Sequence, residues 1–152
     1  MRLSLDIVTT LCIGWLIGVE LAVSAFVNPI LSRLDQPARF DVTRLFAQRL
    51  GAAMPFWYVA SFVLLTVEAF LRRHQSGAAL LIAACAIWAA VIVLTLLFLV
   101  PINNRIARNE FATSSESFLR EHEKWDMRHR WRVVALAAAM ACFLLATGMT
   151  IV

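Results

Sequence analysis

Four apolar segments constrain this chain more than any other feature of its sequence. They cover residues 7–31, 52–71, 78–100 and 133–152, and each supplies the roughly 20 apolar residues that an α-helix needs to cross a bilayer. The composition agrees, because 61% of the residues are hydrophobic and only 16% are charged, more apolar surface than a soluble chain of this length can bury. The sequence therefore predicts an all-α integral membrane protein, with one four-helix bundle domain over residues 1–152.

The first apolar segment has two interpretations. A cleaved signal peptide is one, since Arg2 precedes an apolar run and small residues follow at positions 22–25. However, Glu20 interrupts the run, which then continues to Leu31, and this length suits a retained and tilted membrane helix. We therefore favour a retained helix.

Polar side chains recur every fourth residue on this first helix, at Glu20, Ser24 and Asn28, which predicts a polar stripe on one side. Pro29 is expected to end or kink the helix near the membrane surface. Glu20 lies near the centre of the span, where a carboxylate needs a partner, a water-filled cavity or a proton. A functional role is the favoured interpretation, and a structural hydrogen bond to a neighbouring helix is the alternative.

The region around the second span combines an amphipathic lead-in with an ion pair. Apolar and basic residues alternate over residues 32–50, which is typical of a short helix in the headgroup layer, although a simple lead-in to the next span is equally consistent. Pro55 falls in the first turn of the span predicted over residues 52–71, where proline is tolerated. Glu68 precedes Arg72 by four residues, which predicts an ion pair near the end of this helix.

The third and fourth spans differ in length. The third is predicted to stop at Pro101, whereas a capping-box pattern at residues 113–116 predicts that the fourth helix begins well before its apolar segment. If it continues to Val152, this helix is far longer than the membrane is thick and extends beyond the bilayer. One stripe of that extension carries His122, Trp125, His129 and Arg132.

Basic residues are distributed unevenly about the membrane. The loops over residues 32–50 and 101–132 hold 11 of the 14 Lys and Arg residues and share one side of a four-span protein. The positive-inside rule then favours cytoplasmic large loops and outside termini, in a membrane such as the bacterial inner membrane. Because the arginines lie at the ends of apolar segments and not on one continuous face, we expect membrane lipids and not nucleic acid as partners.

The helix ends on the large-loop side are predicted to form a pocket. Glu20 would lie about 12 Å deeper than Asn28 and form the floor of an apolar-walled cavity with a cationic rim. At the depth of Asn28 we expect a set of polar side chains from the other helices, namely Asn103, Asn104, Arg105, His129 and Arg132. The two asparagines could instead satisfy carbonyl groups at a helix end.

Metal binding is not favoured by the sequence. Cys12, Cys85 and Cys142 lie in three different apolar segments, as free and buried cysteines do. His122 and His129 would be about 10 Å apart on a helix, too far to bind one metal ion. A site built from His129, Glu20 and a third ligand stays open as an alternative, but we expect no metal and no cofactor.

Three stretches resemble one protein family. They are Gly18 to Pro29, the sequence Val-Pro-Ile-Asn-Asn ending at Asn104, and the pattern Trp125, His129 and Arg132. Together they are similar to the anthrone oxygenase-like family of four-helix membrane proteins, and the resemblance covers nearly the whole chain. It implies oxidation of a polycyclic anthrone to an anthraquinone by molecular oxygen, as fungal members perform.

That resemblance implies roles for the predicted site. His129 or a desolvated Glu20 would remove a proton from the substrate. Arg105 and Arg132 would stabilise the resulting anion and reduced oxygen species, and Trp125 would provide an aromatic wall.

Two other classes of function remain open. A non-enzymatic membrane subunit or lipid-binding module would use the small residues Gly14 and Gly18 to pack against a partner, including a second copy of the chain. Ion conduction would need a polar path through both halves of the membrane, and only Glu68 marks the other half. A cavity bounded by Glu20, Asn103 and His129 would favour ligand chemistry over both.

Overall fold

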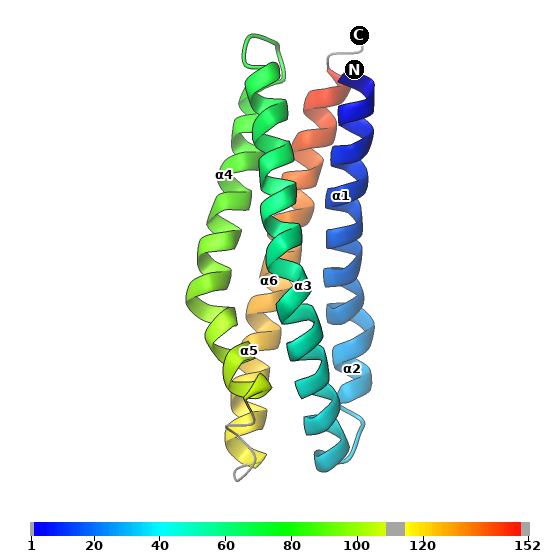
Figure 1. Ribbon diagram of the computed structural model, residues 1–152, viewed down its shortest axis with the longest axis vertical. Helices are drawn as coiled ribbons and strands as arrows, with labels where there is room; N and C mark the ends of the chain where they lie inside the picture. The colour runs from blue at the N-terminus through cyan, green and yellow to red at the C-terminus, as the bar shows by residue number, and fades with distance from the viewer. Residues whose placement is uncertain (1, 109–114, 150–152) are drawn as a thin grey trace.

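Four long helical rods form the bundle in the computed structural model, which describes residues 2–108 and 115–149 (Figure 1). The first rod joins α1 (Arg2–Ala22), the π-helical turn η1 (Val23–Val27) and α2 (Asn28–Leu31). The second is α3 (Gln36–Leu71), and the third joins α4 (Ala78–Leu94), the π-helical turn η2 (Thr95–Leu99) and α5 (Val100–Ala107). The fourth is α6 (Ser115–Gly148). The predicted all-α class is confirmed.

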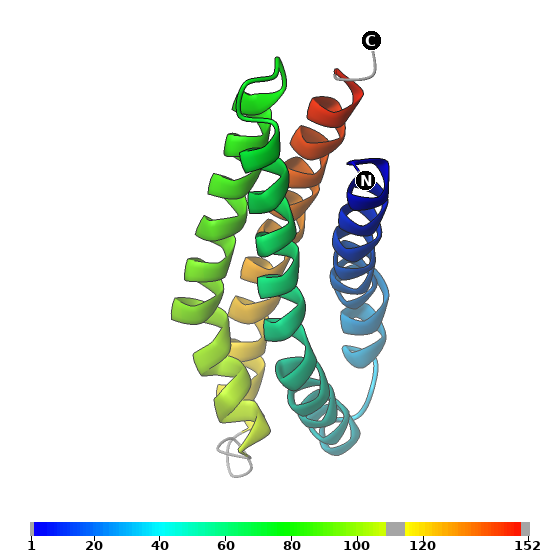
Figure 2. The same cartoon turned by 45° about the horizontal axis from the view of Figure 1, so that its top comes forward.

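The rods run up and down in chain order. α1 packs on α3 and α6, α4 packs on the same two helices, and α1 and α4 occupy opposite corners (Figures 1 and 2). The start of α1, the end of α6 and the α3–α4 turn lie at one end, and the α2–α3 connection lies at the other (Figure 1). We call these the short-loop end and the large-loop end.

The bundle is apolar both inside and outside. The interior holds fully buried side chains such as Leu16, Trp88 and Phe143. The outside carries large apolar side chains that water would not tolerate in such numbers, for example Phe56, which is 81% exposed, and Leu97, which is 62% exposed. Four stretches are long and apolar enough to cross a membrane, namely Arg2–Leu31, Gln36–Leu71, Ala78–Ala107 and Glu116–Gly148. The protein is an integral membrane protein.

The second rod differs from the prediction of a separate surface helix before the span. α3 is one continuous helix that includes both the amphipathic lead-in and Pro55. Its lead-in packs inside the bundle, where Phe40 meets the ring of Phe118 in α6 at a centroid distance of 5.1 Å and Thr43 is buried. Part of the apolar side of the lead-in therefore packs on protein, whereas Leu45 and Phe46 remain exposed.

Two prolines do not stop their helices. We predicted that Pro29 ends or kinks the first helix and that the third span stops at Pro101. The prediction for Pro101 is wrong, because that rod continues to Ala107, whereas the first rod ends at Leu31, two residues after Pro29. In each rod the π-helical turn ends two residues before the proline, and this wider turn accommodates the missing backbone hydrogen bond.

The length of α6 agrees with the prediction. It comprises 34 residues, about 51 Å, and so exceeds the roughly 30 Å hydrocarbon core of a bilayer. It begins at Ser115, and the two capping-box residues before that position lie outside the described residues. Since its apolar stretch begins near Val133, the first half of α6 carries the charged turns of the helix.

Candidate functional site

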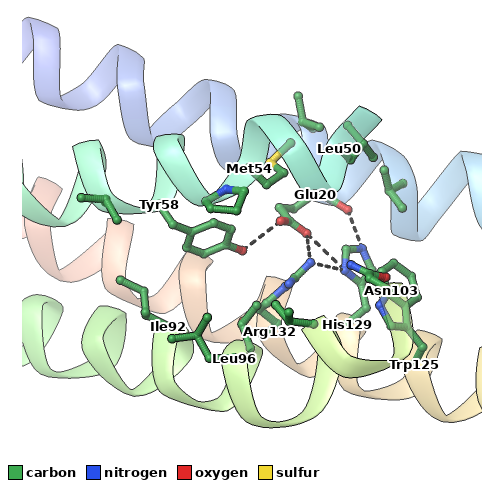
Figure 3. A pocket seen from close by; sticks show the side chains of 17 residues that line it. Glu20, Leu50, Met54, Tyr58, Ile92, Leu96, Asn103, Trp125, His129 and Arg132 are labelled. Atoms are coloured by element: carbon green, nitrogen blue, oxygen red, sulfur yellow. Dashed lines mark hydrogen bonds and ion pairs between the residues drawn. The ribbon is translucent and has the colours of Figure 1, made fainter. Parts of the chain in front are cut away.

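Four polar side chains meet inside the bundle around Glu20 (Figure 3). Arg132 Nη2 of α6 lies 2.6 Å from Glu20 Oε2, and the Tyr58 hydroxyl of α3 donates to Glu20 Oε1 at 2.9 Å. His129 Nδ1 lies 3.1 Å from Glu20 Oε2. Glu20 is only 3% exposed, so its charge is compensated by Arg132 and by hydrogen bonds and not by water.

Both ring nitrogens of His129 have polar partners. Its Nε2 lies 3.1 Å from the backbone carbonyl oxygen of Glu20, which can only accept a hydrogen bond, so Nε2 carries a proton. Its Nδ1 lies 2.8 Å from Arg132 Nη2, which can only donate. His129 thus contacts the backbone of Glu20 through Nε2 and both Arg132 and the Glu20 carboxylate through Nδ1, and it links α6 to α1.

An aromatic ladder supports this histidine. Trp125 stacks on His129 with ring centroids 4.6 Å apart and planes 11° apart, and His122 stacks on Trp125 at 6.0 Å. Phe118 continues the ladder, 5.7 Å from His122. The prediction that Trp125, His129 and Arg132 share one face of a helix is confirmed, and the stacking fixes the ring of His129.

A cavity of about 180 Å³ adjoins the Glu20 cluster, and all four rods contribute to its walls. Its polar lining includes Glu20, Tyr58 and Arg132, and most of the rest is apolar, for example Met54 and Ile92 (Figure 3). The exposed lining residues come from α3 and η2, namely Gly51, Pro55, Val59 and Leu96. The cavity therefore opens sideways between these two elements, towards the lipid.

Three buried polar atoms of the cavity lining lack a partner among the described residues. They are Trp125 Nε1, Arg132 Nε and Thr95 Oγ1. An unsatisfied buried donor costs about 1–3 kcal/mol, so such atoms are uncommon in a packed interior. Here they lie within the cavity wall, beneath its accessible surface.

The structure brings together five of the eight predicted site residues. All five line the cavity: Glu20, Asn103, Trp125, His129 and Arg132. A cavity bounded by Glu20, Asn103 and His129 was the feature that we expected to favour ligand chemistry, and it is present (Figure 3).

The other three predicted residues lie elsewhere. Asn28 is buried, but its side chain donates to Asp126 at 2.5 Å and lines a small adjoining cavity of about 50 Å³. Asn104 is exposed. Arg105 is 48% exposed and lies 3.6 Å from Glu121, so it extends towards the outside of the large-loop end.

One prediction about depth is wrong. We placed His129 and Arg132 level with Asn28, about 12 Å from Glu20, but both contact Glu20 directly. A buried carboxylate needs a cation, and among the described residues Arg132 supplies it, with Nη2 2.6 Å from Glu20 Oε2. The basic turn of α6 therefore enters the bundle instead of lying at its rim.

Tyr58 is the site residue that sequence reasoning missed. It is the only tyrosine of the chain and lies inside the second span. Because a buried phenol hydroxyl requires a hydrogen-bond partner and Glu20 requires a donor, pairing the two was possible from the sequence. For Asp126 and Thr95 the sequence contains no comparable indication of a place near the site.

In residues 2–108 and 115–149, no group of three or more His, Cys, Asp or Glu side chains is placed to hold a metal ion. The three cysteines are free and half-buried, as the sequence predicted.

Fold and cavity together define a class: four-span helical membrane proteins with a polar cavity inside an apolar bundle. Within this class the chain belongs to the anthrone oxygenase family, whose sequence profile matches residues 43–142 and confirms the resemblance seen in the motifs. No curated protein and no solved structure matches the chain. The matched region carries Tyr58, Trp125, His129 and Arg132, whereas Glu20 on α1 lies before it.

Proposed function

We propose that this protein oxidises a fused-ring aromatic ketone of the anthrone type with molecular oxygen, in the cavity beside Glu20. One observation carries the proposal: a carboxylate paired with a guanidinium forms the polar wall of an apolar cavity that opens towards lipid. Membership of the anthrone oxygenase family supports the reaction class.

The reaction needs a base and a site for negative charge. An anthrone methylene group plus O₂ gives a ring carbonyl plus water: both hydrogens of the methylene leave in the water, together with one oxygen atom. Loss of the first proton produces a delocalised anion that supplies electrons to oxygen. We take Glu20 as the base because its carboxylate lines the cavity, whereas His129 is held between the Glu20 backbone carbonyl and Arg132.

The remaining polar groups suit the anion. The ketone oxygen of an anthrone gains negative charge when the methylene loses its proton. The guanidinium group of Arg132 lines the cavity and can stabilise such an oxygen. The indole of Trp125 also offers a flat surface for a fused-ring substrate. In this scheme His129 positions Arg132 and the backbone of Glu20 and does not take the proton itself.

The lateral opening suits a lipid-soluble substrate. Gly51 and Val59 of α3 and Leu96 of η2 are exposed at the cavity mouth and face the region that lipid chains would occupy. A hydroxylated polycyclic ketone dissolves readily in the bilayer. It could enter between α3 and η2 without crossing the charged large-loop end.

The test is oxygen consumption and quinone formation by the purified protein with anthrone-type substrates. Glu20→Gln should lower kcat by about 100-fold or more, because a general base contributes that much. The matched control is Glu68→Gln, the same change at a second buried carboxylate outside the cavity, which should keep near-wild-type turnover. Unchanged turnover in Glu20→Gln contradicts the proposal, and tight ligand binding without oxygen consumption supports the ligand-binding alternative instead.

A further inference from the structure

A second cavity lies on the other side of Arg132 from the first. It has a volume of about 480 Å³ and lies between the α4–η2 segment and α6. Arg132 and Thr95 line both cavities and so separate them. We call the second cavity the η2–α6 groove. The proposed oxidation reaction gives it no role.

The η2–α6 groove is amphipathic along the bundle axis. Val91 and Ala135 lie towards its deep end, and Phe98, Arg128 and Trp131 lie towards the large-loop end. From Val91 to Phe98 the helix rises about 10 Å, which is a substantial part of an acyl chain. Trp131 is 72% exposed, as aromatic side chains at membrane interfaces are.

The polar end of the groove lies at headgroup depth. Arg128 falls where the charged first half of α6 gives way to the apolar stretch that begins near Val133. Basic side chains at this boundary meet lipid phosphates. The groove therefore presents a cation where a headgroup lies and apolar walls where an acyl chain lies.

Arg128 also differs from its basic neighbours in its partners. Its guanidinium lies over the Phe98 ring, 5.2 Å from the centroid, and donates to the Phe98 carbonyl at 3.4 Å. By contrast, Arg130 pairs with Asp126 at 2.9 Å, and Arg120 pairs with Glu116 at 3.0 Å. Within the described parts of the chain, no carboxylate pairs with Arg128, so its charge is available to an anion from outside.

From these observations we propose that an anionic phospholipid of the surrounding membrane binds in the η2–α6 groove. Its phosphate contacts Arg128, the Trp131 ring lies at the level of the glycerol group, and one acyl chain runs along Val91 and Ala135. Charge complementarity selects an anionic over a zwitterionic headgroup. The acyl chain also covers the lipid-facing side of Arg132 and shields its ion pair with Glu20 from water.

The experiment measures lipid retention by the full-length protein in mild detergent with native mass spectrometry. The probes are phosphatidylglycerol and phosphatidylcholine with identical acyl chains. Wild-type protein should retain phosphatidylglycerol in preference, and Arg128→Gln should lower its retention about fivefold, the effect of one basic residue at a charged surface. Arg130→Gln is the matched control, with the same charge change two residues away, and should retain the lipid like the wild type.

A second variant tests the apolar end of the groove without changing charge. Ala135→Trp should fill the deep end and lower phosphatidylglycerol retention, while the melting temperature and the elution volume stay like those of the wild type. Equal retention of the two lipids by the wild type overturns the proposal, as does equal retention by Arg128→Gln and Arg130→Gln. Retention of inorganic phosphate alone, with no preference between the lipids, also overturns it.

Discussion

Two buried ion pairs lie at different heights in the same bundle, and one of them borders the cavity beside Glu20. At the large-loop side Glu20 and Arg132 join α1 to α6 across 112 positions of sequence. At the short-loop end Glu68 and Arg72 pair within α3 at 3.1 Å, and Arg72 also binds Asp6 of α1. The two glutamates are almost equally buried, at 3% and 1% exposed.

The comparison shows that burial of charge does not by itself mark a functional site. Thr9 adds a hydrogen bond to Glu68 at 3.5 Å, and none of the three cavities described above includes Glu68 or Arg72 in its lining. The Glu68 cluster fastens α1 to α3 at the end of the bundle. The Glu20 cluster lines a cavity, and this difference supports a ligand site there.

The largest expected effect is the loss of stability when the cation that compensates the Glu20 charge is removed. Arg132→Gln leaves the Glu20 carboxylate buried without its cation, which should destabilise the protein by about 3–5 kcal/mol. Thermal unfolding in detergent, followed by circular dichroism, measures the loss. Wild-type stability in this variant would mean that water or another group already compensates Glu20.

A double variant distinguishes the contribution of the Glu20–Arg132 pair to stability from its contribution to turnover. Glu20→Gln combined with Arg132→Gln removes both charges, so most of the lost stability should return while turnover stays at least about 100-fold below wild type. The corresponding pair, Glu68→Gln with Arg72→Gln, should leave turnover within about twofold of wild type, since surroundings remote from the reaction contribute little. If both double variants lose activity equally, the distinction between the clusters fails.

A smaller effect is expected from single hydrogen bonds. Tyr58→Phe removes the donor that orients Glu20 Oε1 and should reduce kcat about tenfold with little change in KM, because a misplaced base removes the proton less efficiently. Thr9→Val removes the equivalent bond to Glu68 and should leave kcat unchanged. Steady-state kinetics on both variants decides whether Tyr58 acts on the reacting carboxylate.

The smallest expected effect concerns the cavity mouth. A Cβ at Gly51 meets nothing within 4 Å, so Gly51→Phe should fold normally and narrow the opening between α3 and η2. KM for a bulky substrate should rise a few-fold while kcat stays within about twofold. The reason is that the substitution weakens binding of the substrate and of the transition state equally and leaves the chemical step unchanged. Gly18→Phe, at an equally open position on α1 outside the cavity lining, is the control. A fall in kcat with constant KM would place the substrate entrance elsewhere.

The predicted helix-contact surface at Gly14 and Gly18 stays a proposal for association with a second chain. Gly14 faces Met140 of α6 in the same chain, where a Cβ would lie 3.7 Å from the methionine Cε. Gly18 is exposed and has open space around it. Gly18 is therefore the position available to a neighbouring helix.

By itself the sequence determined the parts of this protein that depend on local composition. Segment length and apolarity define four membrane-spanning helices, and helical spacing places Trp125, His129 and Arg132 on one face. The cost of burying a carboxylate identified Glu20 as a residue that needs a partner. These inferences need no knowledge of how the helices pack.

Only the tertiary structure decided which groups meet, because the register between helices depends on packing along the whole bundle. Each π-helical turn inserts extra backbone, and one added residue rotates the following face by about 100°. η1 lies between Glu20 and Asn28, and both side chains contact α6, where Glu20 binds Arg132 and Asn28 binds Asp126. The pairing of Glu20 with Arg132 and Tyr58 likewise follows from the axial register of α1, α3 and α6, which spacing within one helix does not encode.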